Sequence, residues 1–188
     1  MLLNEQISPA GEADIPALNE LVNSAYRGES SQRGWTSEGH LLGGIRTSEQ
    51  SLREMFQNPS ATLLKYVADG QLLGCVYLEE KKPDLYLGML TVSPDAQANG
   101  IGKKLMAIAE QIAIDKEYQV IAITVISIRH ELIAWYERRG FRATGETVPF
   151  PDDERFGQPK QPLEFIVMKK KLEENYDTEI KGDTQIKK

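Results

Sequence analysis

The sequence predicts one mixed α/β domain, and three observations lead to that fold class. Short apolar runs typical of strands are interleaved with stretches whose apolar residues recur every three or four positions, as in helices. Their order is strand, helices, three strands, helix, strand, helix and two strands. The chain has 188 residues, of which 40% are apolar, enough to bury one sizeable core. We expect a domain over residues 1–172 and a polar tail over residues 173–188.

The first third of the chain predicts a strand followed by helices. Residues 2–7 favour a strand, and residues 15–25 carry apolar side chains at helical spacing after Asp14, a suitable N-cap. A glycine- and serine-rich stretch follows, in which we expect a short helix over residues 37–42. Residues 48–58 then predict a longer helix that ends before a proline.

The remaining elements are delimited by turn residues and by one buried strand. Residues 61–80 predict two strands joined by an Asp-Gly turn. The run VIAITVIS is apolar almost throughout, as in strands that are covered on both faces. Four of the nine prolines predict a long structured loop over residues 147–162. The other expected elements are strands over 85–94, 120–127, 141–148 and 162–172, and helices over 101–116 and 130–139.

Composition excludes several classes of function. A formal net charge of −6 argues against a nucleic-acid partner. Cys75 is the single cysteine and lies in an apolar run, so we expect a buried hydrophobic role and no disulfide. With two histidines in the chain, His40 and His130, we expect no metal site. The N-terminus lacks the pattern of a signal peptide, and no window is apolar enough for a bilayer, so we expect a cytoplasmic protein without a membrane partner.

The stretch QANGIGKKL, residues 97–105, predicts an anion site. It follows an expected strand and opens an expected helix, whose first N–H groups point outward. Gly100 and Gly102 would let a ligand approach the backbone, and Lys103 and Lys104 add positive charge. Two glycines near a helix start also occur without any ligand. The spacing fits neither a Walker loop nor a dinucleotide fingerprint.

The surrounding residues make this turn more specific. LGMLTVSPDAQANGIGKKL resembles the signature of the GNAT acetyltransferase superfamily, with Gln97, Gly100 and Gly102 at its key positions. AWYERRGF, residues 134–141, resembles a second landmark of that family, a tyrosine-bearing helix followed by Gly-Phe. The order of elements agrees over residues 3–172. The resemblance implies a mixed central sheet of about six to seven strands, splayed at the cofactor site, with about four helices.

The resemblance also implies chemistry. GNAT enzymes transfer acetyl from acetyl-CoA to an amine by direct attack through a tetrahedral intermediate. Backbone amides at the glycine turn would hold the pyrophosphate, and the strand before it would lie along the pantetheine arm, with the Leu90 amide polarising the thioester carbonyl. The cofactor-binding residues implied in this way are Leu90, Thr91, Val92, Gln97, Ala98, Asn99, Gly100, Ile101, Gly102 and Lys103.

Tyr136 matches the general acid of the family, which protonates the departing thiolate. The alternative is that it only packs against the cofactor. The general base stays open, because residues 84–89 lack the glutamate that many relatives carry there. A subset that acetylates protein N-termini uses a glutamate on the following strand and an asparagine at the start of the tyrosine helix. This chain has Thr124 and Arg129 at those positions, which argues against copying the roles of either subset. The base is absent, is replaced by a chain of waters, or comes from elsewhere, with Glu38, His40, Glu79 and Glu80 as the candidates.

The acceptor usually enters this fold between an early helical segment and a late loop, here residues 26–46 and 147–162. The candidate substrate-binding residues there are Tyr26, Trp35 and Phe150. Both segments mix acidic and basic residues, so a cationic amine and an amino acid fit equally well. We expect an N-acetyltransferase for a small amine or amino-acid-like acceptor. The alternatives are a protein or peptide amine, or a module that binds acetyl-CoA without turnover. Monomer and homodimer both stay open.

Overall fold

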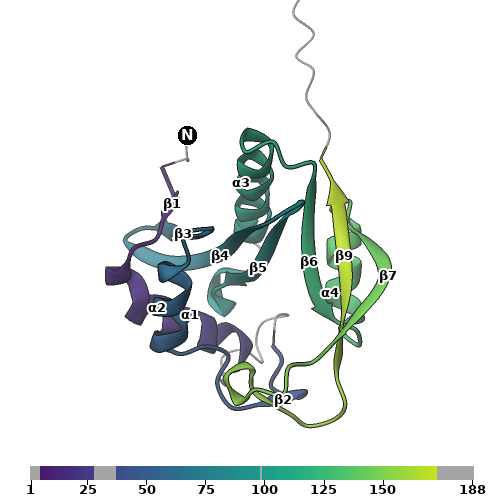
Figure 1. The fold of residues 1–188 in the computed structure, drawn as a ribbon. Helices are drawn as coiled ribbons and strands as arrows, with labels where there is room; N and C mark the ends of the chain where they lie inside the picture. Colours follow the sequence, from purple (N-terminus) through teal and green to yellow (C-terminus); the bar gives the residue numbers. More distant parts are fainter. Residues whose placement is uncertain (1–4, 28–36, 98, 173–188) are drawn as a thin grey trace, which may run out of the picture.

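The computed structural model describes residues 5–27, 37–97 and 99–172 (Figure 1). A seven-stranded sheet has the order β1-β3-β4-β5-β6-β9-β7, and a small second sheet pairs β2 with β8. The β5–β6 pair is parallel and the other pairs are antiparallel. The strands are β1 (Ile7–Pro9), β2 (Leu42–Gly43), β3 (Ala61–Ala68), β4 (Gln71–Lys81), β5 (Asp84–Val92), β6 (Val120–Ile126), β7 (Arg142–Pro149), β8 (Gln158–Pro159) and β9 (Glu164–Lys171). The helices are η1 (Glu12–Asp14), α1 (Ile15–Tyr26), α2 (Glu49–Gln57), η3 (Pro94–Ala96), α3 (Ile101–Asp115), α4 (His130–Glu137) and η4 (Glu154–Phe156).

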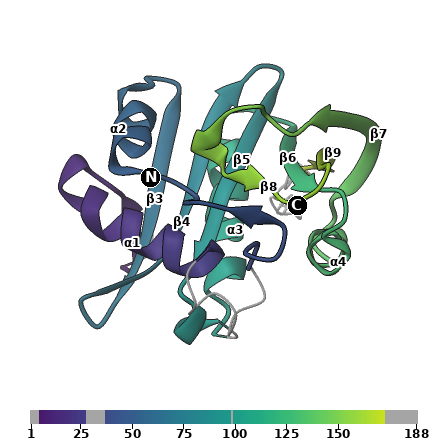
Figure 2. The same ribbon diagram turned by 90° about the horizontal axis from the view of Figure 1, so that it is seen from below.

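Helices cover both faces of the large sheet, and each face has its own core (Figure 2). On one face, α1 and α2 bury Leu18 and Leu52 against β3, β4 and β5. On the other face, α3 buries Leu105 together with Ile121 of β6 and Phe141, which follows α4. The alternation of side chains along each strand feeds both cores, which is why the strands read as nearly continuous apolar runs.

The sheet opens between its two central strands. β5 and β6 are in register only at Leu85–Ile121 and Tyr86–Ala122. β6 nevertheless runs on to Ile126 and stays paired with β9 along its whole length. Figure 1 shows β5 and β6 close together at one end and apart at the other. The facing backbone groups beyond Tyr86 therefore lack a strand partner on this side.

A bulge in β5 lies where the strands separate. Between the pairs Cys75–Thr91 and Tyr77–Gly88, β5 has one residue more than β4. Met89 adopts a φ of 47°, a left-handed conformation that costs a residue with a side chain about 1–2 kcal/mol. Leu90, the next residue, has no register partner on β4 or on β6. A strained residue is thus kept beside an unpaired peptide, a combination that is typical of functional sites.

The expected mixed α/β fold is confirmed, with seven strands in the main sheet and four α-helices among the described residues. The expected splay is confirmed by the β5–β6 register. The Ser48 cap of α2 is present, since its hydroxyl accepts from the Ser51 N–H at 3.1 Å. Asp14 does stand at the N-cap of α1, but its carboxylate accepts from the Gly11 N–H and from Lys65 instead of capping that helix.

Two boundaries predicted from the sequence are wrong. The short helix expected over residues 37–42 is a turn, closed by the N–H groups of Leu41 and Leu42 on the carbonyl of Glu38. Leu42 then enters β2 because β8, far along the chain, offers it a pairing partner. The first strand starts at Ile7 instead of ending there, because Ile7 is buried and paired with Tyr66. The predicted loop over 147–162 includes the end of β7 and all of β8.

Residues 173–188, the predicted polar tail, lie outside the described residues. In the described part of the chain, no helix is both long and apolar enough to cross a membrane. Cys75 is fully buried and unpaired, in agreement with the hydrophobic role expected of it.

Candidate active site

A cavity of about 430 Å³ occupies the opening between β5 and β6. Its floor is the bulged part of β5, from Gly88 to Leu90, and one wall is β6 with Thr124. Tyr136 of α4 reaches it from the side. Two segments far apart in the sequence complete the lining. They contribute Tyr26, Glu38 and Arg46 from the first third of the chain, and Val148, Pro149, Pro151 and Phe156 from the last.

Tyr136 presents a phenol to this cavity. The ring is 8% exposed and makes edge-on contacts with Trp135, at 5.0 Å between centroids, and with Phe141, at 5.4 Å. Its hydroxyl forms no hydrogen bond with any described residue. Burial raises the pKa of the Tyr136 phenol above its ordinary value, so the group keeps its proton across the neutral and mildly alkaline range. A phenol in this state can act as a proton donor.

Tyr26 fixes the bulge from the opposite side. Its hydroxyl donates to the carbonyl of Leu90 at 2.6 Å. The hydroxyl of Thr91 donates to the carbonyl of Met89 at 3.0 Å. Both bulge carbonyls are therefore held by side chains. Burial raises the pKa of Tyr26 to about 12, which preserves the donor.

The glycine turn begins α3 as a backbone anion site requires. Gly100 is the N-cap and has a φ of 73°, which favours glycine, and a Cβ placed there would meet no atom within 4 Å. The space above the turn is open, so the residues present fit a phosphate group. Gly102 differs from Gly100, because it lies in the first turn of α3 and a Cβ there would meet Val92 and Trp135 at ordinary contact distances of 3.6 and 3.7 Å. Ala98 lies outside the described residues.

The other expected cofactor residues are placed around this turn. The side chains of Thr91, Val92 and Ile101 are buried, so only their backbone can face a ligand. Asn99 and Lys103 are exposed. Lys104 turns away from the opening and contacts Gln6 and the ring of Tyr66. The Gln97 amide donates to the carbonyl of Val92 at 3.3 Å, which ties the turn back to β5.

A family model described as acetyltransferase (GNAT) domain matches residues 42–151, more than half of the chain. The chain belongs to the GNAT acetyltransferase family. The members of this family use acetyl-CoA, and the opened sheet and glycine turn described above are the parts expected to receive it. Among curated proteins, no match is found.

Solved structures share the GNAT fold at low sequence identity. The smu.2055 protein of Streptococcus mutans UA159 superposes with a TM-score of 0.67 at 20% identity, over 89% of this chain and 99% of its own. The ribosomal-protein-alanine N-acetyltransferase of Brucella melitensis reaches 0.65 at 23% identity, over 91% and 100%. The PaiA N-acetyltransferase of Thermoplasma acidophilum, a coenzyme A complex, reaches 0.60 at 19% identity, over 90% and 99%. At such identities the likeness shows the fold alone.

Of the candidates for a general base in this GNAT domain, only some line the cavity. Glu38 is the one carboxylate among the described residues that line the cavity. Its oxygens face two guanidinium groups, with Arg27 at 3.3 Å and Arg129 at 3.8 Å, which favours a structural role. Thr124 shares a hydrogen bond of 3.1 Å with Tyr86. The other candidates, His40, Glu79 and Glu80, are not among the lining residues.

The three expected acceptor residues have different positions. Tyr26 lines the cavity. Phe150 does not, because it stacks on Phe165 at 5.3 Å in a small separate core with Leu41. Phe156, from the same loop, lines the cavity and is 43% exposed. Trp35 lies outside the described residues.

Sequence reasoning missed the way in which the two acceptor segments are joined. β2 pairs with β8, and the guanidinium of Arg27 donates to the carbonyls of Gly43 and Phe156 at 2.9 and 3.1 Å. Arg27 also pairs with Glu38. We call these contacts the Arg27 clamp. The sequence gives only a weak signal for it, since an arginine directly after an amphipathic helix does not indicate which residues it will contact.

Proposed function

We propose that the protein transfers an acetyl group from acetyl-CoA to the primary amine of a small molecule. The observation that carries this proposal is the opening of β5 from β6. It puts on one cavity Leu90, whose N–H has no strand partner, and the Tyr136 hydroxyl, which has no partner among the described residues. An acyl transfer needs both groups, a donor for the developing oxyanion and an acid for the leaving thiolate. We propose residues 1–172 as the acetyltransferase domain.

The proposed roles of the residues follow the order of the reaction. The amides of residues 98–102 and the side chain of Lys103 would hold the pyrophosphate, and the backbone from Leu90 to Val92 would run beside the pantetheine arm. The acceptor nitrogen attacks the thioester carbonyl carbon, and the Leu90 N–H stabilises the negative oxygen. When the C–S bond breaks, Tyr136 would give its proton to the sulfur, and the extra proton on the attacking nitrogen would leave to water, from which the phenolate of Tyr136 would be protonated again. The products are the N-acetylated acceptor and free coenzyme A.

The nucleophile must be an uncharged amine. Since Glu38 is engaged by two arginines, we propose that the ammonium proton leaves to solvent or through water before attack. A primary amine with an ordinary pKa near 10 is mostly protonated at neutral pH. We therefore expect kcat/KM to rise with pH up to the pKa of the acceptor amine.

The size of the cavity supports a small acceptor. A volume of about 430 Å³ lies within the range of small-molecule sites. The Arg27 clamp joins the two acceptor segments across one side of it. If the acceptor is a protein amine, simple amines should not be acetylated but peptides should. If the protein is a module without turnover, neither should be acetylated.

The test is an acceptor screen that follows the release of thiol from acetyl-CoA. We expect turnover with at least one class of small primary amine. Turnover confined to peptides with free N-termini would replace the small-molecule acceptor by a protein. If calorimetry detects acetyl-CoA binding but no amine or peptide releases thiol, the transferase proposal fails and a binding module remains.

A further inference from the structure

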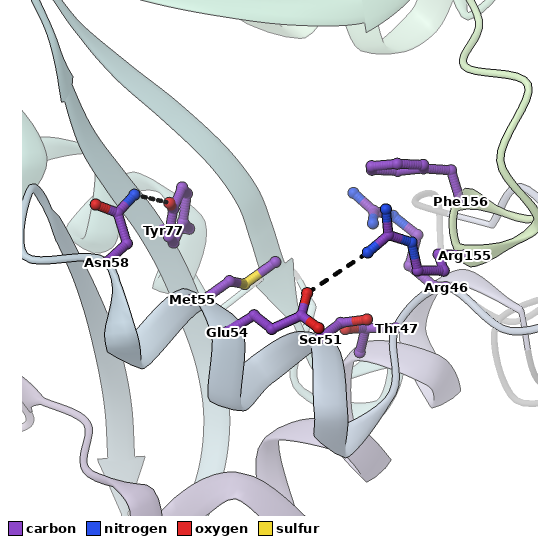
Figure 3. Close-up of a pocket in the computed structure, with 9 residues that line it drawn as sticks. All are labelled: Arg46, Thr47, Ser51, Glu54, Met55, Asn58, Tyr77, Arg155 and Phe156. Carbon is purple, nitrogen blue, oxygen red and sulfur yellow. Dashed lines mark hydrogen bonds and ion pairs between the residues drawn. The ribbon is translucent and has the colours of Figure 1, made fainter.

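A second cavity adjoins the first beside α2. It has a volume of about 220 Å³, and Arg46 and Phe156 line both cavities. Figure 3 shows α2 with Ser51, Glu54 and Met55 as one wall, while Arg155 and Phe156 approach from the late loop. An acceptor whose amine lies near Leu90 and Tyr136 can therefore extend past Arg46 into this side cavity.

Arg46 is the charged group at the junction. Its guanidinium lies over the Tyr26 ring, 5.4 Å from the centroid, and forms no ion pair with any carboxylate of the described residues. The neighbouring arginines are all engaged. Arg27 and Arg129 pair with Glu38, and Arg155 pairs with Glu54 and Asp153. Arg46 thus lines both cavities as a positive charge without a carboxylate partner among the described residues.

Thr47, the next residue, supplies a second polar group. It is 3% exposed, it lines the side cavity, and its hydroxyl has no hydrogen-bond partner in the part of the chain that the structure describes. A buried hydroxyl without a partner costs roughly 1–3 kcal/mol of desolvation, an expense that a ligand could offset. The backbone here is fixed by Asn23, which accepts from the Arg46 and Thr47 N–H groups and donates to the Thr47 carbonyl. The arginine and the hydroxyl are therefore held in place before any ligand binds.

The charge of the main cavity points in the same direction. Its lining holds one acid, Glu38, and three bases, Arg46, Lys81 and Arg129. The chain as a whole has a formal net charge of −6. Lys81 is also paired with Glu79 and Arg129 with Glu131, so Arg46 is the base of this lining that lacks a carboxylate partner among the described residues, and it favours an anionic ligand group.

We propose that the acceptor is an amine that also bears a carboxylate, and that Arg46 and Thr47 hold this carboxylate. The proposal rests on the acetyl transfer proposed above and names its substrate class. A planar guanidinium matches the two oxygens of a carboxylate. One unpaired cation and one hydroxyl balance a single negative charge better than the nearly double charge of a phosphate.

The first test compares acceptors that differ only in the carboxylate. Suitable pairs are phenylalanine with phenethylamine and lysine with cadaverine. We expect kcat/KM to favour the amino acid of each pair by about 10- to 100-fold, as for a hydrogen bond to a charged group. Equal values, or a preference for the amines that lack the carboxylate, would overturn the proposal.

The second test removes the guanidinium. Arg46→Gln should raise KM for the amino acid by about 10- to 100-fold and leave the KM for its decarboxylated partner nearly unchanged. Arg53→Gln is the matched control, since it makes the same change of charge on the outer face of α2, where Arg53 pairs only with Glu49. If both variants raise the KM for the amino acid equally, the overall electrostatic potential of the protein, and not a carboxylate site at Arg46, sets the preference for amino acids.

The variant Thr47→Val tests whether the Thr47 hydroxyl binds the acceptor or stabilises the fold. Because the hydroxyl has no partner in the free protein, the variant should melt at the wild-type temperature or above it while the KM for amino acids rises. A lower melting temperature with an unchanged KM would assign the hydroxyl to the fold.

Calorimetry distinguishes failure of this inference from failure of the transferase proposal. If no amine is acetylated, binding of phenylalanine and phenethylamine to the wild type and to Arg46→Gln still measures the carboxylate site. Carboxylate binding that depends on Arg46 would uphold the site without transfer, and the absence of any such binding would overturn it.

Discussion

The proposed cofactor end and the proposed acceptor end of the site are built from different groups. At the cofactor end, the groups that matter are mostly backbone: the open peptides of β5, the bulge at Met89 and Leu90, and the helix start at Gly100. At the acceptor end they are side chains, such as Arg46 and Phe156, which two remote segments bring together. A backbone site binds a constant group such as a pyrophosphate, whereas a side-chain site can be changed to suit one acceptor.

The two ends are also held differently. The cofactor end lies on the main sheet and on α3, a helix of 15 residues packed into the larger core. The acceptor end depends on the two-residue strands β2 and β8 and on the clamp made by Arg27. Changes at the cofactor end should therefore affect every acceptor, and changes at the acceptor end should alter the choice among acceptors.

The largest expected effect is that of Tyr136→Phe. The ring contacts with Trp135 and Phe141 survive, and the lost hydroxyl has no partner among the described residues, so folding should be nearly unaffected. Loss of a general acid should reduce kcat by about 10²- to 10⁴-fold for every acceptor. Steady-state kinetics measure kcat, and calorimetry should show unchanged binding of acetyl-CoA. A decrease in kcat below about threefold would indicate that the phenol only packs against the cofactor.

Gly100→Glu should have the next largest effect. It places a carboxylate in the open space above the turn, where the phosphates are proposed to bind, and like charges there cost several kcal/mol. We expect the Kd for coenzyme A, measured by calorimetry, to rise by at least about 100-fold.

Gly145→Glu is the control for backbone strain. Gly145 also has a positive φ, of 87°, and open space around its Cβ, but it lies on the edge strand β7. Both variants put a side chain at a positive φ and add the same charge. If they weaken coenzyme A equally, or if Gly100→Glu leaves the affinity unchanged, the pyrophosphate has been placed wrongly.

The same contrast explains what could be predicted from the sequence. The order of the elements and the glycine turn were predicted from local patterns such as the apolar run of β6, and the splay was implied by the resemblance to the GNAT family. The sequence did not separate the two glycines of the turn: Gly100 adopts the left-handed conformation, whereas a Cβ at Gly102 would make only ordinary contacts.

The acceptor end was predicted as two segments but not as a set of contacts. The residues near Leu42 do not predict a strand, because its pairing partner β8 lies more than a hundred residues away in the sequence. Phe150 and Phe156 have the same residue type in one loop, yet Phe150 stacks on Phe165 and Phe156 lines the cavity. Which aromatic side chain turns inward depends on tertiary packing, and the sequence alone does not reveal it.

The smallest expected effect concerns Tyr26, which touches both ends of the cavity. Tyr26→Phe keeps the ring beneath Arg46 and removes the hydrogen bond to the Leu90 carbonyl, so unfolding at pH 8 should cost about 1 kcal/mol less. The pKa of Tyr26 is raised to about 12 in the folded protein, above its ordinary value near 10. The stability gained from keeping the proton is complete below pH 10 and is lost as the pH rises toward 12. At pH 11 the wild type should therefore lose on the order of 1 kcal/mol that the variant does not lose. Urea unfolding of both proteins at pH 8 and pH 11 measures the difference, and parallel pH profiles would show that the phenol is not buried as described.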